Sequence, residues 1–161
     1  MNLAGALLIV SGAYYLGVAA AKRESERLIL IEALISLFSY MQRRILAERL
    51  PLIRIFKEFT NEHLEKTGFL PTLRLGRSKI EHVWQTAVSR LLIEKSLRQE
   101  LLLFGDGLGA LPLERQLARI DSCLSLLRDE KARLISELPK KKKSIKTVYL
   151  LIGLTVSIIL L

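Results

Sequence analysis

Charge is confined to the middle of this chain. Every Lys, Arg, Asp and Glu lies between Lys22 and Lys146, so the first 21 and the last 15 residues carry no charged side chain. Both ends are rich in Leu, Ile, Val, Ala and Gly. A helix needs about 20 apolar residues to cross the hydrocarbon core of a bilayer. The distribution of charge therefore predicts a membrane protein with two hydrophobic ends around a charged middle.

Residues 1–21 predict an N-terminal transmembrane helix, because they form an uncharged apolar run of nearly the length that a span requires. A cleaved signal peptide is the alternative, since Val18–Ala21 offers small residues near a cleavage point. Signal peptides carry positive charge before the apolar stretch. Here Lys22 and Arg23 follow it. We therefore expect an anchor that is not removed.

Residues 147–161 predict a second, shorter transmembrane helix. At about 1.5 Å of rise per residue this segment covers about 22 Å of a hydrocarbon core that is about 30 Å thick. Local thinning of the bilayer and extension of nearby lysine side chains toward the headgroups allow so short a span. The alternative is a buried C-terminal helix of the middle domain.

The basic residues predict the orientation in the membrane. All 25 Lys and Arg lie between the two ends, and positive charge beside a span stays in the cytoplasm. The middle, residues 22–139, is therefore expected to be cytoplasmic, with both termini on the other side. Residues 140–146 form a basic juxtamembrane segment, the lysine collar, which is expected to attract anionic lipid at about 1 kcal/mol per basic residue. The collar comprises Lys140, Lys141, Lys142, Lys143 and Lys146.

The cytoplasmic middle is predicted to be all-α, a helical bundle. Apolar residues recur with helical spacing from Glu24 to Leu50, and Pro51 is expected to end that helix or begin the next. We expect a loop over Gly68–Gly76, a helix that begins near Ser78, and a break between Ser89 and Ser96.

A heptad pattern runs through residues 113–138. Its apolar positions are spaced alternately four and three residues apart, with Lys131 as the one polar member, and Pro139 is expected to end the helix. A lysine at such a position lowers stability but selects register or partner, so Lys131 is a candidate specificity residue. The pattern fits either antiparallel packing within one chain or a coiled coil between chains. The seam comprises Leu113, Leu117, Ile120, Leu124, Leu127, Lys131, Leu134 and Leu138.

Catalytic residues are scarce. The two histidines, His63 and His82, lie on different predicted helices without neighbouring ligands at metal spacing, and Cys123 has no nearby histidine. The run Gly105–Ala110 matches the dinucleotide fingerprint in letters, but no βαβ unit surrounds it. Its glycines are better interpreted as a helix stop and a turn. We expect no enzyme activity, catalytic residue, metal or cofactor.

One segment resembles a known family. Trp84, the run Phe104-Gly105-Asp106-Gly107-Leu108-Gly109, and then Gln116 and Ile120 look like the C-terminal half of stage III sporulation protein AB. The layout of two apolar ends around a helical middle is similar too. The family usually has an Asp soon after the Leu-Gly pair, where this chain has Ala110–Pro112. The resemblance implies that these residues form a motif for packing or for partner binding. The motif comprises Trp84, Phe104, Gly105, Leu108, Gly109, Gln116 and Ile120.

The resemblance implies a function. Proteins of this family are similar to the cytoplasmic domains of type II secretion inner-membrane platform proteins and serve a secretion-like channel that endospore development needs after engulfment. The chain would then be a noncatalytic platform in the mother-cell-derived outer forespore membrane. Its implied partners are the cytoplasmic ATPase of the channel and the ring-forming membrane subunits. The alternatives are a general secretion or pilus assembly component, and a membrane-tethered binder of nucleic acid or anionic lipid. The net charge of +9 is the reason for considering a nucleic-acid or lipid binder. Basic and acidic residues are mixed along the predicted helices, however, and no aromatic or glycine-rich nucleic-acid-binding motif accompanies them, which argues against nucleic acid.

Overall fold

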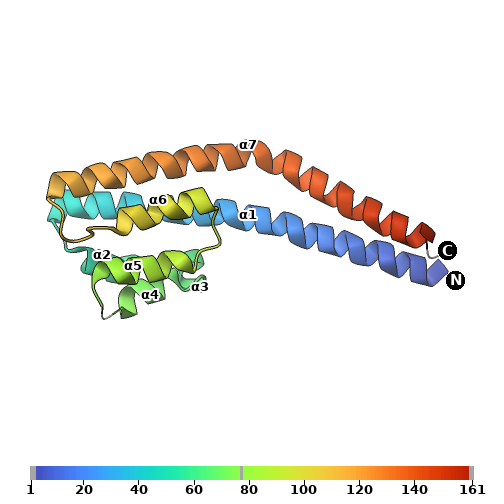
Figure 1. Ribbon diagram of the computed structural model, residues 1–161, viewed down its shortest axis with the longest axis horizontal. Helices are drawn as coiled ribbons and strands as arrows, with labels where there is room; N and C mark the ends of the chain where they lie inside the picture. The colour runs from blue at the N-terminus through green and yellow to red at the C-terminus, as the bar shows by residue number, and fades with distance from the viewer. Residues whose placement is uncertain (1–2, 77, 160–161) are drawn as a thin grey trace. The chain divides into compact units, whose positions relative to one another are not determined.

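The computed structural model describes residues 3–76 and 78–159, and all regular secondary structure in this part of the chain is α-helical (Figure 1). The predicted all-α class is therefore confirmed. Two compact units are formed: the bundle unit, Ile29–Lys131, and the terminal unit, which contains the segments up to Leu28 and from Ala132 onward. The helices are α1 (Leu3–Glu48), α2 (Leu52–Glu58), α3 (Glu62–Lys66), α4 (Phe69–Leu75), α5 (Ile80–Ser89), α6 (Lys95–Gly105) and α7 (Leu113–Ile159).

Within the bundle unit, α5 packs between α4 and α6, and α4 also contacts the short helices α2 and α3 (Figure 1). The bundle-unit part of α1 runs antiparallel to that of α7. Glu32 is paired with Lys131, whereas Gln42, further along α1, donates a hydrogen bond to Asp121, earlier on α7. The heptad seam thus packs within the chain, where Ile120, Leu124 and Leu127 are buried in the bundle unit.

The boundary between α1 and α2 follows the sequence prediction. Helix α1 ends at Glu48, and Pro51 occupies the N-cap position of α2, where its missing N–H is not needed. Between them Arg49 adopts a left-handed conformation, with φ of 49°, while its N–H donates to the Ile45 carbonyl at 3.1 Å. The predicted break before α6 is also confirmed, because α5 ends at Ser89 and α6 begins at Lys95.

The predicted loop over Gly68–Gly76 is wrong, because this stretch forms α4. Pro71 suggested irregular structure, but it falls in the first turn of the helix, where proline costs no hydrogen bond. Phe69, Leu70 and Leu73 supply a short apolar face that is buried in the bundle unit. Burial of that face stabilises a helix too short for its period to be recognised in the sequence.

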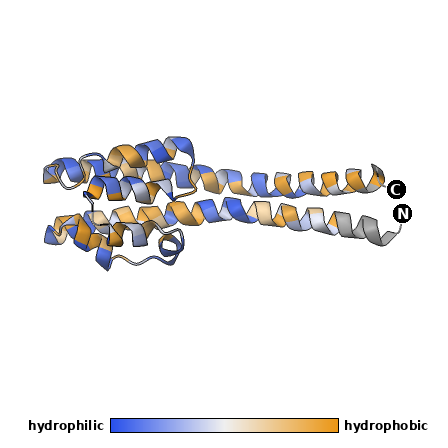
Figure 2. Ribbon diagram, turned by 60° about the horizontal axis from the view of Figure 1, so that its bottom comes forward, coloured by the Kyte–Doolittle hydropathy of each residue, from blue (hydrophilic) through white to orange (hydrophobic). Residues whose placement is uncertain are grey.

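The predicted end of the heptad helix at Pro139 is also wrong. Helix α7 continues through Pro139 into the lysine collar and beyond. An interior proline removes one backbone hydrogen bond and usually kinks a helix. Side-chain pairing continues across it, since Lys141 Nζ lies 3.2 Å from Glu137 Oε2, one turn away. Figure 2 shows α7 polar over the collar and increasingly apolar toward its C-terminal end.

In the terminal unit, the described parts of α1 and α7 are in contact. A Cβ atom added to Gly17 would lie 3.0 Å from Tyr149 Cβ, so the two helices approach closely there. Lys141 Nζ is 4.0 Å from Glu24 Oε2, close to where the charged middle of the chain meets its uncharged ends. Large apolar side chains remain exposed on both helices, among them Tyr15 at 74% and Ile158 at 70%.

The predicted spans at residues 1–21 and 147–161 extend over residues 1–2 and 160–161, which lie outside the described part of the chain. Within the described part, no helix combines the length and the apolar character that crossing a membrane requires.

Candidate partner-binding site

The family-like motif centres on the single tryptophan of the chain. Trp84 is completely buried, and its Nε1–H donates a hydrogen bond to the Leu101 carbonyl at 2.6 Å. Its ring centroid lies 5.2–6.0 Å from the rings of four phenylalanines, which come from four different helices. Aromatic pairs in this range add to the energy of apolar burial. Trp84 therefore joins α1, α2, α4 and α6 to α5 through Phe38, Phe56, Phe69 and Phe104.

The absence of a side chain at Gly105 allows the Trp84 ring to pack directly against α6. A Cβ atom at this position would lie 2.4 Å from Trp84 Cδ1 and 3.2 Å from Nε1. The indole ring lies almost against the α6 backbone, which is also why its N–H reaches the carbonyl of Leu101. Any side chain at Gly105 would push the ring out of this position.

The turn after α6 is fastened to its neighbours through its backbone. Gly107 and Gly109 both have positive φ, 79° and 82°, a conformation that glycine adopts without strain. Glu81 on α5 accepts a hydrogen bond from the Gly107 N–H at 2.8 Å, and Arg119 on α7 donates to the Asp106 carbonyl. The predicted helix stop and turn is confirmed, and its position is fixed from both sides.

Most of the motif lies in the core. Trp84, Phe104, Gly105, Leu108 and Ile120 are buried in the bundle unit. Two members remain at the surface: Gly109 is exposed and Gln116 is half-buried. The motif therefore builds and orients the bundle unit, and it offers a partner only the edge formed by its turn and the start of α7.

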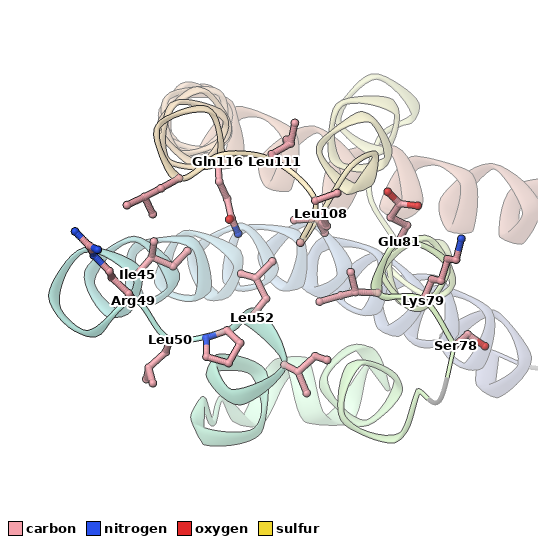
Figure 3. Close-up of a pocket in the computed structure, with 16 residues that line it drawn as sticks. Ile45, Arg49, Leu50, Leu52, Ser78, Lys79, Glu81, Leu108, Leu111 and Gln116 are labelled. Atoms are coloured by element: carbon pink, nitrogen blue, oxygen red, sulfur yellow. The ribbon is translucent and has the colours of Figure 1, made fainter.

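That edge borders a groove of about 910 Å³ (Figure 3). The end of α1, the start of α2, the start of α5 and the turn before α7 form its walls, and all of them belong to the bundle unit. Aliphatic side chains make up most of the lining. They are Ile45, Leu50, Leu52, Ile53, Ile80, Leu108, Leu111 and Leu113, joined by Pro51 and Ala110.

Charged side chains lie at opposite ends of this groove. Arg49 and Lys79 are both exposed, and Figure 3 shows them at its two ends. Neither has an acidic partner among the described residues. The carboxylate of Glu81, which lies near Lys79 in Figure 3, accepts a hydrogen bond from the Gly107 N–H. The half-buried Gln116 extends its amide into the groove without a side-chain hydrogen bond inside the described part of the chain.

An ion-pair network joins the C-terminal end of α1 to α2, the two helices that flank Arg49 and Pro51. Arg44 on α1 pairs with Glu48 and with Glu58 on α2, and Arg54 Nε lies 3.2 Å from Glu58 Oε1. The hydrogen bond from Arg44 holds the pKa of the Glu58 carboxyl below its ordinary value, with smaller contributions from the charges of Arg44 and Arg54. The network ties the last turn of α1 to α2.

Sequence reasoning did not find the groove, because its walls come from four separated segments. One local signal was present: Arg49 follows the apolar helix and precedes Leu50-Pro51, so it stands at a helix end where glycine is common. Without the fold, nothing indicated that Lys79 would lie across the groove from it.

The other predicted residues lie elsewhere. Lys131 Nζ is 2.9 Å from Glu32 Oε1, an ion pair within the chain whose side chains are 37% and 47% exposed. In the collar, Lys140, Lys143 and Lys146 are exposed, whereas Lys141 and Lys142 are half-buried. Lys140 and Lys143 border a shallow hollow of about 380 Å³ together with Ser144 and Thr147.

The reactive residue types are dispersed. Among residues 3–76 and 78–159, no group of three His, Cys, Asp or Glu side chains lies together as a metal site. His63 is half-buried and His82 exposed. Burial, with a smaller contribution from Glu100, raises the pKa of the Cys123 thiol to about 11. That shift makes the thiol a weaker source of thiolate than an ordinary cysteine.

Comparison with known proteins gives one family. The family model described as stage III sporulation protein AB matches residues 2–161. No curated protein and no solved structure matches the chain. The matched range includes both uncharged ends, the aromatic centre around Trp84 and the glycine turn. The chain therefore belongs to the stage III sporulation protein AB family.

Proposed function

We propose that this chain is a noncatalytic, membrane-anchored platform in a secretion-like channel that endospore development requires after engulfment. Membership of the stage III sporulation protein AB family implies a role in sporulation. The match along residues 2–161 is the observation that carries the proposal, because it includes the two uncharged ends as well as the bundle unit.

The platform is proposed to be anchored at both ends. Residues 1–21 and 147–161 have no charged side chain. In the terminal unit, Tyr15, Leu16 and Ile158 expose 62–74% of their surface, which is unfavourable in water and favourable in lipid. The exposed lysines of the collar stand beside the C-terminal end, where anionic headgroups would attract them. We propose the mother-cell-derived outer forespore membrane as the location, with the bundle unit in the cytoplasm.

The bundle unit is proposed to present a binding surface to the ATPase of the channel and to its ring-forming subunits. Its core is made from aromatic and aliphatic side chains, and its reactive residues are dispersed or used in ion pairs. This arrangement supports a role in assembly, since a rigid scaffold can position partners without taking part in a reaction.

Membrane attachment is tested by fractionating sporulating cells and washing the membranes with alkaline carbonate. The full chain is expected to stay in the membrane pellet. Chains that lack either 1–21 or 147–161 should be retained less, and a chain lacking both should be soluble. A full chain that the wash releases would contradict the anchors. The lysine collar is tested separately by vesicle binding at neutral pH: replacing its five lysines by glutamine in a chain without 1–21 should weaken binding, with the largest loss on vesicles that contain anionic lipid.

The role in the channel is tested by deleting the gene in the source organism. Engulfed forespores should form and then collapse, and heat-resistant spores should be lost. The wild-type chain expressed in trans should restore them, whereas the chain without both ends should not. Full chain solubilised in mild detergent should copurify with the neighbouring ATPase or with a sister membrane subunit. Normal sporulation in the deletion strain would overturn the proposal.

A further inference from the structure

The groove between Arg49 and Lys79 has the character of a protein-docking site. Its lining is mostly aliphatic, and Ile53 on its rim exposes 58% of its surface. Leu50 and Leu111 are only half-buried. Apolar groups left in water at a concave surface favour contact with another apolar surface. An apolar groove of this kind suits the apolar face of a helix.

The charges at its ends define the partner further. The guanidinium of Arg49 and the ammonium of Lys79 stand at opposite ends without acidic partners among the described residues (Figure 3). Among the described residues of the lining, Glu81 has the only carboxylate, and it accepts a hydrogen bond from the Gly107 N–H. The cations at the two ends therefore attract a partner that carries acidic residues, and they repel the same basic ends of a second copy of this chain.

The backbone at Arg49 points to the same conclusion. Its φ of 49° makes it the one non-glycine residue with positive φ among the described residues. Glycine would occupy this helix end without strain. A strained residue at a surface is a sign of function when its side chain meets a candidate site. Here the strained residue places a positive charge at the mouth of the groove.

We propose that this groove binds an amphipathic helix of a partner protein, with apolar residues at i, i+3 or i+4, and i+7 and with an Asp or Glu near each end. The apolar face fills the space between α1, α2 and α5. One acidic side chain pairs with Arg49 and the other with Lys79, while the amide of Gln116 bonds a polar group along the middle of the helix. This inference rests on the platform role proposed above and specifies the chemistry of its partner.

The occupant is identified by photo-crosslinking in sporulating cells that express the full chain. A benzoylphenylalanine at position 53 replaces the exposed Ile53, and one at position 92 replaces Leu92, which is 85% exposed outside the groove, as the control. Position 53 should give one dominant protein adduct, and its cross-linked peptide should be an amphipathic sequence with acidic residues at both ends. An adduct to lipid, to a second copy of this chain, or to a segment without acidic residues would overturn the proposal.

Charge variants test the recognition itself. Arg49→Glu and Lys79→Glu should each lower the yield at position 53 at least tenfold, whereas Arg128→Glu, an equal change at an exposed position outside the groove, should leave it unchanged. Replacing the matching acidic residue of the captured peptide by lysine should restore the yield with Arg49→Glu. Arg49→Gly should also lower the yield while the protein stays folded. An unchanged yield with Arg49→Glu refutes the groove.

The two proposals fail in different ways. Normal spore formation without the chain would overturn the platform role, whatever the cross-linking shows. If the Arg49→Glu chain cross-links like the wild type while a separate deletion strain still fails to form spores, the groove alone is overturned.

Discussion

Replacing Gly105 by alanine should destabilise the bundle unit through one contact. The added Cβ would lie 2.4 Å from Trp84 Cδ1, a distance that atoms in a folded core do not tolerate. Since Gly105 is the last residue of α6, its backbone cannot move without disturbing the turn that follows. The indole of Trp84 must therefore move, and the movement breaks its hydrogen bond to Leu101.

The size of the effect follows from these contacts. Forcing a methyl group into a filled core costs about 1–3 kcal/mol. Leaving the buried Trp84 N–H without an acceptor costs about 1–3 kcal/mol more, although a partial shift keeps some of that bond. Alanine's better helix propensity returns at most about 1 kcal/mol. We expect a net loss of about 2–4 kcal/mol in the free energy of unfolding, or about 5–15 °C in Tm.

The assay can use the tryptophan itself. Trp84 is the only tryptophan in the chain, so its fluorescence during urea unfolding of the full chain reports on this core. Gly12→Ala serves as the control, because a Cβ there meets no atom within 4 Å. It should not lower stability. A Gly105→Ala protein that unfolds at the wild-type urea concentration would refute the reasoning.

A double-mutant cycle isolates the contact. Trp84→Ala removes the whole ring, including the Cδ1 atom nearest Gly105, so Gly105→Ala should cost at least about 1 kcal/mol less in that background than in the wild type. Far-UV circular dichroism replaces fluorescence here, since the tryptophan is gone. Equal costs in both backgrounds would show that the alanine acts through the backbone and not through the ring.

Three further perturbations test separate parts of the structure. Arg49→Gly should stabilise the protein by up to about 1 kcal/mol in the free energy of unfolding, because glycine adopts the left-handed conformation of this position without strain. The urea concentration at the unfolding midpoint should rise, and a lower midpoint would contradict this. Since Arg44 lowers the pKa of Glu58 in the folded state, the pair stabilises the protein above the ordinary pKa of a glutamate, and this contribution is lost as the pH falls through the lower, folded value. Between pH 6 and pH 3.5 the wild type should therefore lose more stability than Arg44→Gln. With its pKa raised to about 11, the Cys123 thiol should react with maleimide at pH 8 about a hundredfold more slowly than in the urea-unfolded chain; equal rates would contradict its burial.

Local chemistry predicted several elements correctly. Pro51 marked the boundary after α1, and Gly107 and Gly109 marked the turn after α6, because these residues restrict or free the backbone whatever surrounds them. The 113–138 heptad is helical, and Ile120, Leu124 and Leu127 are buried as its spacing predicts. The period alone left open whether the seam packs within the chain. The pairing of Glu32 with Lys131 answers that, and it required the fold.

Two local predictions were wrong because tertiary or neighbouring context outweighed a proline. Pro71 lies in the first turn of α4, whose three buried apolar residues stabilise a helix of only 7 residues. Pro139 lies inside α7, where helix-forming residues and the Glu137–Lys141 pair stand on either side of it. A proline thus predicts a helix boundary only when the residues around it do not favour a helix.

The candidate site was the least predictable part. The motif residues Trp84, Phe104 and Gly105 were identified from the sequence, but their mutual contact depends on how α5 meets α6. The groove depends on four segments that are distant in the chain. Arg49 and Lys79 are ordinary exposed cations by sequence, and only the packing of α1 and α5 places them at two ends of one surface.

The aromatic centre also constrains how the protein is made. Phe38 on the first helix contacts Trp84 and Phe104, which leave the ribosome much later. At synthesis rates of about 5–20 residues per second, the apolar side of α1 remains uncovered for on the order of ten seconds until Trp84 and Phe104 have been synthesised. Nascent chains on one messenger RNA thus display the same uncovered helix side by side. A chaperone, or early delivery of the ribosome to the membrane, would have to shield it. A chain truncated before Phe104 would leave this side of α1 partly uncovered.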